Sequence, residues 1–187
     1  MVGSIIQPGD LETIHNLDFL GVNYYTRTVI QHDPKFPIFS FIQTHPSGNE
    51  YSGMWEIYPE GLFELLQDIW DNYGSKLEPQ GKMPEILVTE NGIPVPDGID
   101  FDGKVRDERR IRYLKNHILQ VHQAIQKGVP VKGYFVWSFM DNFEWALGYA
   151  PRFGLVHVDF PTQKRTIKES GFWFSKVIAN NGFTIDS

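Results

Sequence analysis

Short apolar runs that alternate with longer amphipathic segments constrain the fold of this chain more than any other feature. The runs have the length and nearly continuous apolar character of buried strands, whereas the longer segments repeat apolar residues every three or four positions, as packed helices do. We expect strands at residues 17–25, 85–89 and 131–137, and helices at residues 59–73, between Asp107 and Gly128, and at residues 168–179. Elements in this order form a parallel sheet with right-handed crossovers, so the sequence predicts an α/β fold of three βα units.

Long irregular stretches interrupt this alternation. Residues 31–58 contain Pro and Gly residues that forbid a long regular element, namely Pro34, Pro37, Pro46, Gly48 and Gly53. Loops of this length are usually functional or mobile. We expect a second irregular stretch at residues 90–106 and a short hairpin or strand extension at residues 155–160.

The length of the chain limits which α/β fold it can form. A single domain over residues 1–187 is the natural expectation for 187 residues with 41% hydrophobic content. A closed TIM (β/α)8 barrel typically takes about 250 residues, and three parallel strands alone leave two unpaired edges and one open face. The sequence therefore predicts a portion of such a barrel that another chain or segment completes.

Charge and cysteine content argue against several classes of function. Seventeen Lys and Arg against 23 Asp and Glu give a net charge of −6 without a long basic run, which argues against a nucleic-acid-binding protein. The chain has no Cys and no His pair with metal-ligand spacing, so we expect no metal or other cofactor. The N-terminal residues lack the pattern of a secretory signal, and no segment has the length of a membrane span. We therefore expect a cytoplasmic protein without membrane contact.

The strongest candidate for a chemical role is the sequence Thr89-Glu90-Asn91-Gly92, which directly follows the apolar run at residues 86–88. In parallel α/β barrels the carboxyl ends of strands carry the catalytic groups. We expect the strand to fix Glu90, and we expect Asn91-Gly92, a pair that tolerates positive φ, to turn the chain away from it. Taken alone, these residues also fit a strand-end Glu followed by an ordinary turn.

Aromatic residues make up 14% of the chain, and several stand beside polar residues rather than inside apolar runs. Aromatic faces next to hydrogen-bonding side chains suit flat, hydroxyl-rich molecules. This composition favours a sugar as the ligand.

Four sequence blocks, in order, resemble the C-terminal part of glycoside hydrolase family 1 β-glucosidases, from about Gly9 to Phe183. The blocks are DFLGVNYYT at 18–26, TENG at 89–92, GYFVWSFMDNFEW at 133–145, and RFG at 152–154 followed by Val158-Asp159. The resemblance implies that the three strands are the sixth, seventh and eighth of the barrel. It also implies retaining hydrolysis of terminal β-linked sugars, a mechanism that uses two carboxylates about 5 to 5.5 Å apart.

The resemblance also implies roles for individual residues. Glu90 matches the nucleophile that forms the glycosyl-enzyme, and Tyr25 matches the residue whose hydroxyl bonds it. The other matched residues form the sugar pocket, with Asn23, Trp137, Glu144, Trp145 and Phe153 on the glycone side and Trp55 on the aglycone side. Taken alone, Trp137 is more often a core aromatic and Glu144 a solvated loop charge.

Within the pocket, Trp137 corresponds to the platform under the sugar ring. Glu144 and Trp145 correspond to the pair that binds the hydroxyls farthest from the scissile bond. The related 6-phospho-β-glycosidases place Ser, Lys and Tyr around the sugar phosphate, where this chain has Glu144, Pro151 and Phe153. Because a carboxylate repels a phosphate, the sequence favours an unphosphorylated sugar.

The resemblance further implies an acid/base Glu in an Asn-Glu-Pro motif, and the chain has no such motif, since Asn49-Glu50 is followed by Tyr51. We therefore expect an N-terminal barrel part that carries Asn-Glu-Pro as the partner. A non-catalytic sugar-binding module is one alternative, and it predicts that Glu90→Gln leaves ligand affinity intact. A self-associating barrel remnant without activity is another, and it predicts homo-oligomers in sedimentation.

Overall fold

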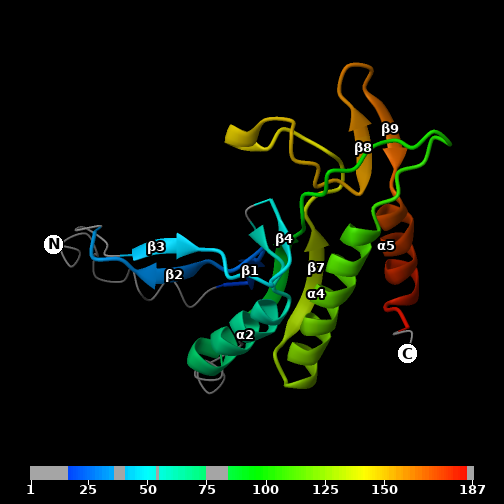
Figure 1. The fold of residues 1–187 in the computed structure, drawn as a ribbon. Coiled ribbons are helices and arrows are strands. Elements are labelled where there is room, and N and C mark those ends of the chain that lie inside the picture. Colours follow the sequence, from blue (N-terminus) through cyan, green and yellow to red (C-terminus); the bar gives the residue numbers. More distant parts are fainter. Residues whose placement is uncertain (1–16, 36–40, 54, 75–83, 185–187) are drawn as a thin grey trace, which may run out of the picture.

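A three-stranded parallel sheet lies at the centre of the protein. The computed structural model describes residues 17–35, 41–53, 55–74 and 84–184. Its central strands are β1 (Phe19–Asn23), β6 (Glu85–Asn91) and β7 (Val131–Val136), in the order β1-β6-β7 (Figure 1). The predicted parallel α/β arrangement is thereby confirmed. The start of the sequence resemblance at Gly9, the N-terminal segment and Pro37 lie outside the described residues.

Three helices lie on one side of this sheet (Figure 1). They are α2 (Glu60–Ile69), which continues as a π-helical turn over Trp70–Gly74, α4 (Glu108–Gln126) and α5 (Glu169–Asn180). Helix α4 contacts both α2 and α5. Each helix begins within one residue of its predicted position, because the three- and four-residue spacing gives each a continuous apolar stripe. In the described part of the chain, no helix is both long and apolar enough to cross a membrane.

The core lies between the sheet and the helices. Alternate strand positions point to this side, and the buried residues from sheet and helices are Val22, Ile86, Val88, Val131, Leu62, Leu66, Val121 and Ala124. Most of the apolar surface removed from water is therefore on the helical face of the sheet.

The opposite face of the sheet is open. Phe19 on β1 is 51% exposed and Phe135 on β7 is 54% exposed. Among the described strands, β1 and β7 each pair with β6 alone, so both outer edges of the sheet lack a partner. An exposed inner face and two free edges are the features that the three-unit prediction implied.

The long stretch at residues 31–58 contains more regular structure than the sequence predicts. Strand β2 (Val29–His32) pairs with β3 (Phe41–Thr44), and β4 (Tyr51–Ser52) pairs with β5 (Trp55–Glu56), both antiparallel. The β2–β3 pair extends away from the central sheet (Figure 1). Pro and Gly residues limit the length of these strands but do not prevent local pairing, because they lie between the strands.

A hairpin stands between β7 and α5 in the last βα unit, and it is one of the two forms expected for residues 155–160. Strand β8 (Val156–Asp159) pairs antiparallel with β9 (Lys164–Ile167), and Val156 also forms a parallel bridge with Met140. The hairpin lies at the end of the molecule toward which β7 points (Figure 1). It therefore stands at the carboxyl edge of the sheet, beside the loop that follows β7.

Candidate active site

Glu90 is the penultimate residue of β6 and thus lies inside the strand, not in the loop after it. The hydroxyl of Tyr25, two residues beyond β1, donates a 2.6 Å hydrogen bond to Oε2 of Glu90. Burial, followed by the hydrogen bond to Glu90, raises the pKa of Tyr25 well above its ordinary value. Tyr25 therefore keeps its proton at neutral pH and remains a donor to the carboxylate.

The two residues after Glu90 have a different role from the predicted turn. Neither Asn91 nor Gly92 has a positive φ. Asn91 is fully buried, and its side-chain amide donates to the backbone oxygen of Tyr24 at 2.7 Å. A Cβ at Gly92 would lie 1.7 Å from the backbone oxygen of Trp137. The prediction of a turn was wrong because close packing between β6 and β7, which is a tertiary contact, decides the use of glycine here.

Helix α4 contributes to the placement of Tyr25. The hydroxyl of Tyr113 accepts a 3.1 Å hydrogen bond from Asn91 and donates one of 3.1 Å to the backbone oxygen of Tyr25. Tyr134 on β7 donates to the side-chain oxygen of Asn91 at 2.5 Å. Sequence reasoning missed these residues, because a Tyr on the apolar face of a helix or strand looks like ordinary core packing.

Three aromatic rings form a wall beside Glu90. The ring centroid of Tyr25 lies 5.1 Å from that of Trp55 and 6.2 Å from that of Phe153, and Trp55 and Phe153 are 5.5 Å apart. Separations of this size are typical of favourable aromatic pairs. The structure thus brings the proposed glycone and aglycone aromatics to the same place as Glu90.

A buried carboxylate fixes the strand that carries Trp55. Arg27, just after β1, binds both carboxylate oxygens of Glu56 at 3.0 and 2.8 Å, and its guanidinium lies 3.8 Å from the ring centroid of Tyr58. Asn49 donates to the same carboxylate at 2.9 Å. A bidentate pair of this kind sets orientation as well as distance. Glu56 therefore holds β5, and with it Trp55, against the end of β1.

The loop after β7 carries Glu144, the second carboxylate of the expected site. Nε1 of Trp137 lies 3.4 Å from Oε2 of Glu144, a long hydrogen bond. Glu144 lines a cavity of about 460 Å³ together with Trp55, Pro151 and Phe153. The charge of Glu144 also contributes to the raised pKa of Tyr25. The Trp137–Ser138 peptide bond is cis.

Asn23 and Trp145 do not line this cavity, and their surroundings differ. The side-chain oxygen of Asn23 accepts a 2.7 Å hydrogen bond from Thr89, which places Asn23 next to Glu90 at the end of β1. Trp145 is 81% exposed and has a φ of 42°, a left-handed conformation that costs energy for a bulky residue. Of the expected site residues, Trp55, Glu144 and Phe153 line the cavity, whereas Glu90, Tyr25, Asn23, Trp137 and Trp145 are not among its lining residues.

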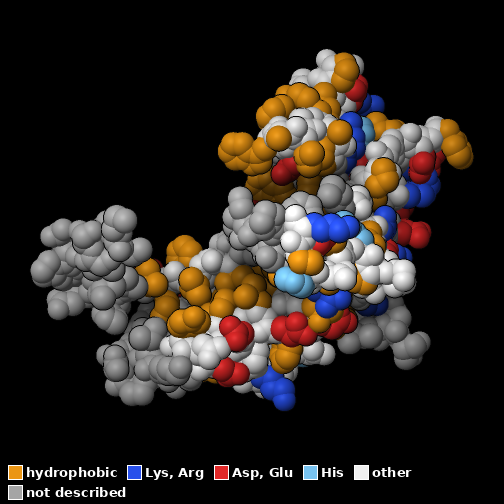
Figure 2. Space-filling model, turned by 60° about the vertical axis from the view of Figure 1, so that its left-hand side comes forward, with side chains coloured by type: hydrophobic (Ala, Val, Ile, Leu, Met, Phe, Trp, Pro, Cys, Tyr) orange, Lys and Arg blue, Asp and Glu red, His pale blue; other side chains and the backbone are white. Residues whose placement is uncertain are grey.

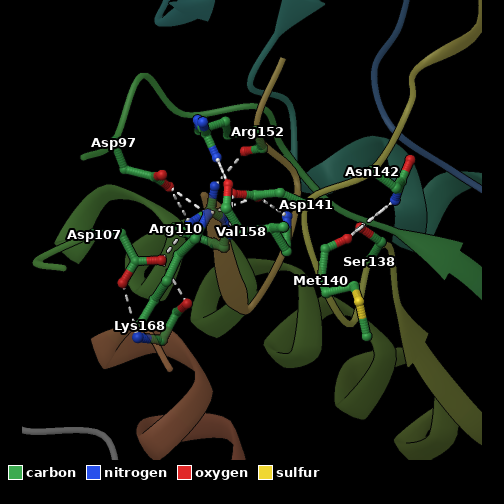
Figure 3. A network of polar contacts seen from close by, with 12 residues as sticks. Asp97, Asp107, Arg110, Ser138, Met140, Asp141, Asn142, Arg152, Val158 and Lys168 are labelled. Atoms are coloured by element: carbon green, nitrogen blue, oxygen red, sulfur yellow. Dashed lines mark hydrogen bonds and ion pairs between the residues drawn. The ribbon is translucent and has the colours of Figure 1, made fainter. Parts of the chain in front are cut away.

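Asp97, Asp141 and His157 place potential metal-ligating atoms within 4.8 Å of one another. The ammonium of Lys168 already contacts both carboxylates, at 2.7 and 2.9 Å. This positive charge opposes the entry of a metal ion. Asp97 and Asp141 belong instead to a network of ion pairs (Figure 3).

The profile of the family described as Glycosyl hydrolase family 1 matches residues 4–183. A 1,4-beta-D-glucan glucohydrolase of Thermotoga neapolitana is 48% identical over 177 residues, which are 94% of this chain and 38% of that protein. Beta-glucosidase A of Thermotoga maritima is 46% identical over 172 residues, which are 91% of this chain and 36% of that protein.

A solved structure of a family 1 β-glucosidase from Thermotoga maritima superimposes with a TM-score of 0.82 at 44% identity, over 91% of this chain and 36% of that one. The predicted fold class, a portion of a (β/α)8 barrel, is therefore confirmed. This chain spans little more than a third of the length of these relatives.

Proposed function

The chain belongs to glycosyl hydrolase family 1, and on that premise we propose that it is the nucleophile-bearing part of a retaining β-glycosidase of the β-glucosidase type. The observation that carries the proposal is the hydrogen bond from Tyr25 to Glu90. A retaining nucleophile must be ionised and fixed in direction, and a partly buried neutral hydroxyl on one carboxylate oxygen supports both requirements. The other oxygen remains available to attack.

The proposed reaction proceeds in two steps. The carboxylate of Glu90 attacks the anomeric carbon as the bond to the leaving oxygen breaks, and the leaving oxygen takes a proton from the acid/base Glu of the Asn-Glu-Pro motif. That residue then removes a proton from water, which attacks the anomeric carbon and releases Glu90. This chain supplies the nucleophile and its hydrogen-bond donor, and another segment supplies the acid/base.

Recognition of the sugar is assigned to the residues around the cavity. We place Trp137 under the sugar ring, Glu144 and Trp145 on the hydroxyls farthest from the scissile bond, and Asn23 and Phe153 along the same pocket. Trp55 faces the aglycone. The proximity of Glu144, Trp55 and Phe153 in one cavity supports this arrangement. A carboxylate accepts hydrogen bonds from two adjacent hydroxyls, which suits an unphosphorylated hexose such as glucose.

We propose that an N-terminal barrel part covers the open side of the sheet. The relatives extend well beyond the matched region, and the exposed Phe19 and Phe135 belong to the face that a closed barrel buries. Hydrophobic side chains also gather on the upper part of the face drawn in Figure 2. The exposed ones of the loop after β7 are Phe139, Phe143, Trp145, Leu147 and Tyr149. The cytoplasmic location stays a prediction from the sequence.

Reconstitution tests this proposal. The 187-residue chain is mixed or co-expressed with an N-terminal family 1 segment that carries Asn-Glu-Pro, and hydrolysis of an aryl β-glucoside is followed. We expect hydrolysis only when both parts are present, and we expect Glu90→Ala to abolish it. Hydrolysis that survives Glu90→Ala contradicts the proposal.

The same material separates the two alternatives. Glucose affinity of the chain alone that Glu90→Gln leaves intact, without hydrolysis after reconstitution, supports a non-catalytic binding module. Homo-oligomers in sedimentation that do not exchange with the N-terminal segment support a self-associated remnant.

A further inference from the structure

A buried network of three carboxylates and three cations includes Asp141 and Arg152, which stand at the two ends of the loop that carries Glu144 (Figure 3). Its members come from the loop after β6, the start of α4, the loop after β7 and the start of α5. They are Asp97, Asp107, Arg110, Asp141, Arg152 and Lys168. The side chain of Arg152 is 21% exposed, and the others are at most 1% exposed. The formal charges balance, which buried ionised groups require.

Asp141 joins the two ends of the loop after β7, and we call this junction of Asp141 with Arg152 and Gly154 the neck of the loop. Its Oδ1 accepts hydrogen bonds from Lys168 and from the backbone N–H of Gly154, both at 2.9 Å. Its Oδ2 accepts from Arg152 at 2.6 Å and from the backbone N–H of Val158 at 3.3 Å. One carboxylate therefore joins the outgoing side of the loop to its returning side and to β8.

Lys168 connects this neck to the rest of the protein. Its ammonium bridges Asp141 to Asp97 at 2.9 and 2.7 Å, and Asp97 also accepts from Arg110 at 2.8 Å. Arg110 in turn bonds Asp107 and donates to the backbone oxygen of Arg152 at 2.5 Å. The neck of the loop is thus fixed to α4 and α5 through Lys168.

The nucleophile side of the site is held by other contacts. Tyr25 and Glu90 are fixed by Asn91 and Tyr113, which are not members of the ion-pair network. Loss of the network therefore acts on the residues between Asp141 and Arg152 while it leaves the Tyr25–Glu90 hydrogen bond in place.

We propose that Lys168 is a positioning residue for sugar recognition: it holds Asp141, and so keeps the loop of residues 142–151 where Glu144 meets the sugar. The positioning rests on the contacts above. Its consequence for the sugar rests on the proposed function. Lys168 lies at the start of α5, and its ammonium contacts Asp141 and Asp97 rather than Glu144 or Glu90, so it acts on the sugar site through these two carboxylates.

Amide hydrogen exchange of the 187-residue chain tests the positioning without any need for activity. Lys168→Met leaves Asp97 and Asp141 without their shared cation, and we expect the Gly154 and Val158 amides to exchange about tenfold faster or more. Amides of β6 should keep their protection. Lys176→Met, an exposed Lys on the same helix, is the matched control and should change neither region.

The result that overturns the positioning role is unchanged exchange at Gly154 and Val158, or equal acceleration across β6. If Lys168→Met does not fold, the charge-balanced pair Lys168→Met with Asp97→Asn is measured instead. That double variant also removes the contact of Lys168 with Asp141, and the same two outcomes decide the proposal.

Kinetics of the reconstituted enzyme test the consequence for the sugar. Glu144 is assigned to hydroxyls that include the one on the exocyclic carbon, which a xyloside lacks. Lys168→Met should raise KM for an aryl β-glucoside about tenfold, with a much smaller change for the aryl β-xyloside and in kcat. An equal rise in KM for the glucoside and the xyloside contradicts a role in sugar recognition. If the wild-type assembly hydrolyses neither substrate, the proposed function fails, and hydrogen exchange still decides the positioning.

Discussion

The hydroxyl of Tyr25 donates a 2.6 Å hydrogen bond to Oε2 of Glu90 across two adjacent parallel strands. The two residues lie 65 positions apart in the sequence, so the contact depends on the pairing of β1 with β6. It gives the proposed nucleophile a fixed direction and a donor that keeps its proton at neutral pH.

Tyr25→Phe removes this donor without removing the ring. We expect glycosylation of Glu90 in the reconstituted enzyme to slow by about 10-fold to 100-fold, because a preorganised hydrogen bond is lost at the reacting carboxylate. The burst of dinitrophenolate from a dinitrophenyl β-glucoside measures this step. Tyr73→Phe, at a position 66% exposed, is the control and should leave the burst unchanged. An unchanged burst in Tyr25→Phe contradicts the assigned role.

Gly92→Ala should destabilise the protein. The added Cβ would lie 1.7 Å from the backbone oxygen of Trp137, so β6 and β7 must separate. We expect a loss of about 3 kcal/mol, measured as a lower midpoint of urea unfolding. Gly98→Ala meets no atom within 4 Å and should change stability by less than about 0.5 kcal/mol. Equal effects of the two substitutions would disprove this account of the glycine.

His117 should make stability fall under acidic conditions. It is buried, and its Nδ1 lies 2.8 Å from the backbone oxygen of Tyr113. Burial lowers the pKa of His117 from 6.5 to about 4, although the Tyr113 carbonyl acts in the opposite direction. Between these two pKa values the imidazole of His117 is mostly protonated in the unfolded chain and mostly neutral in the folded protein. The resulting stability is therefore fully present above pH 6.5 and is lost as the pH falls toward about 4.

The difference in pKa corresponds to at most about 3 kcal/mol. His117→Gln should flatten the pH dependence of the free energy of unfolding in this window by about that amount. The exposed His122 on the same helix provides the control, and His122→Gln should leave the pH dependence as in the wild type. Identical pH profiles for wild type and His117→Gln would refute the prediction.

The sugar pocket should accept a phosphorylated sugar after three substitutions. Glu144, Pro151 and Phe153 line one cavity, as expected for residues that surround the same part of the ligand. Glu144→Ser removes a repulsive charge, Pro151→Lys adds a cation and Phe153→Tyr adds a hydroxyl. We expect the affinity for glucose 6-phosphate relative to glucose to rise about tenfold or more. Calorimetric titration measures both affinities.

Pro151→Lys alone, with Glu144 retained, is the comparison for this triple variant. Its gain should be smaller, because the carboxylate still faces the phosphate. No gain in the triple variant would show that Glu144 does not face the far end of the sugar.

The central sheet and its helices were predictable because their information is local. Residues 86–88 form a continuous apolar run, and the apolar positions of α4 follow helical spacing over its whole length. The position of Glu90 near the carboxyl end of β6 was predictable for the same reason, since Thr89-Glu90 follows such a run. The β2–β3 hairpin was missed because it depends on pairing across a stretch in which Pro and Gly dominate the local signal.

The support around the site was not predictable from the sequence. Asp97, Arg110, Asp141 and Lys168 are spread over more than seventy positions, and each looks like a surface charge in its local context. Asn91 looks like a turn residue, yet it is buried and hydrogen-bonded on both its amide nitrogen and oxygen. These roles arise only when loops from different βα units meet at the carboxyl edge of the sheet.

The measurement that tests the central claim most directly is peptide mass mapping of the chain reconstituted with an N-terminal part whose acid/base Glu is replaced by Ala, after reaction with a dinitrophenyl β-glucoside. Its leaving group departs without a proton donor, whereas release of Glu90 from the glycosyl-enzyme needs the base that has been removed, so the glycosyl-enzyme accumulates. The account predicts one added glucosyl residue on the peptide that contains Glu90, and none in Glu90→Gln. Turnover with no adduct on that peptide, or an adduct on a different carboxylate, would contradict it.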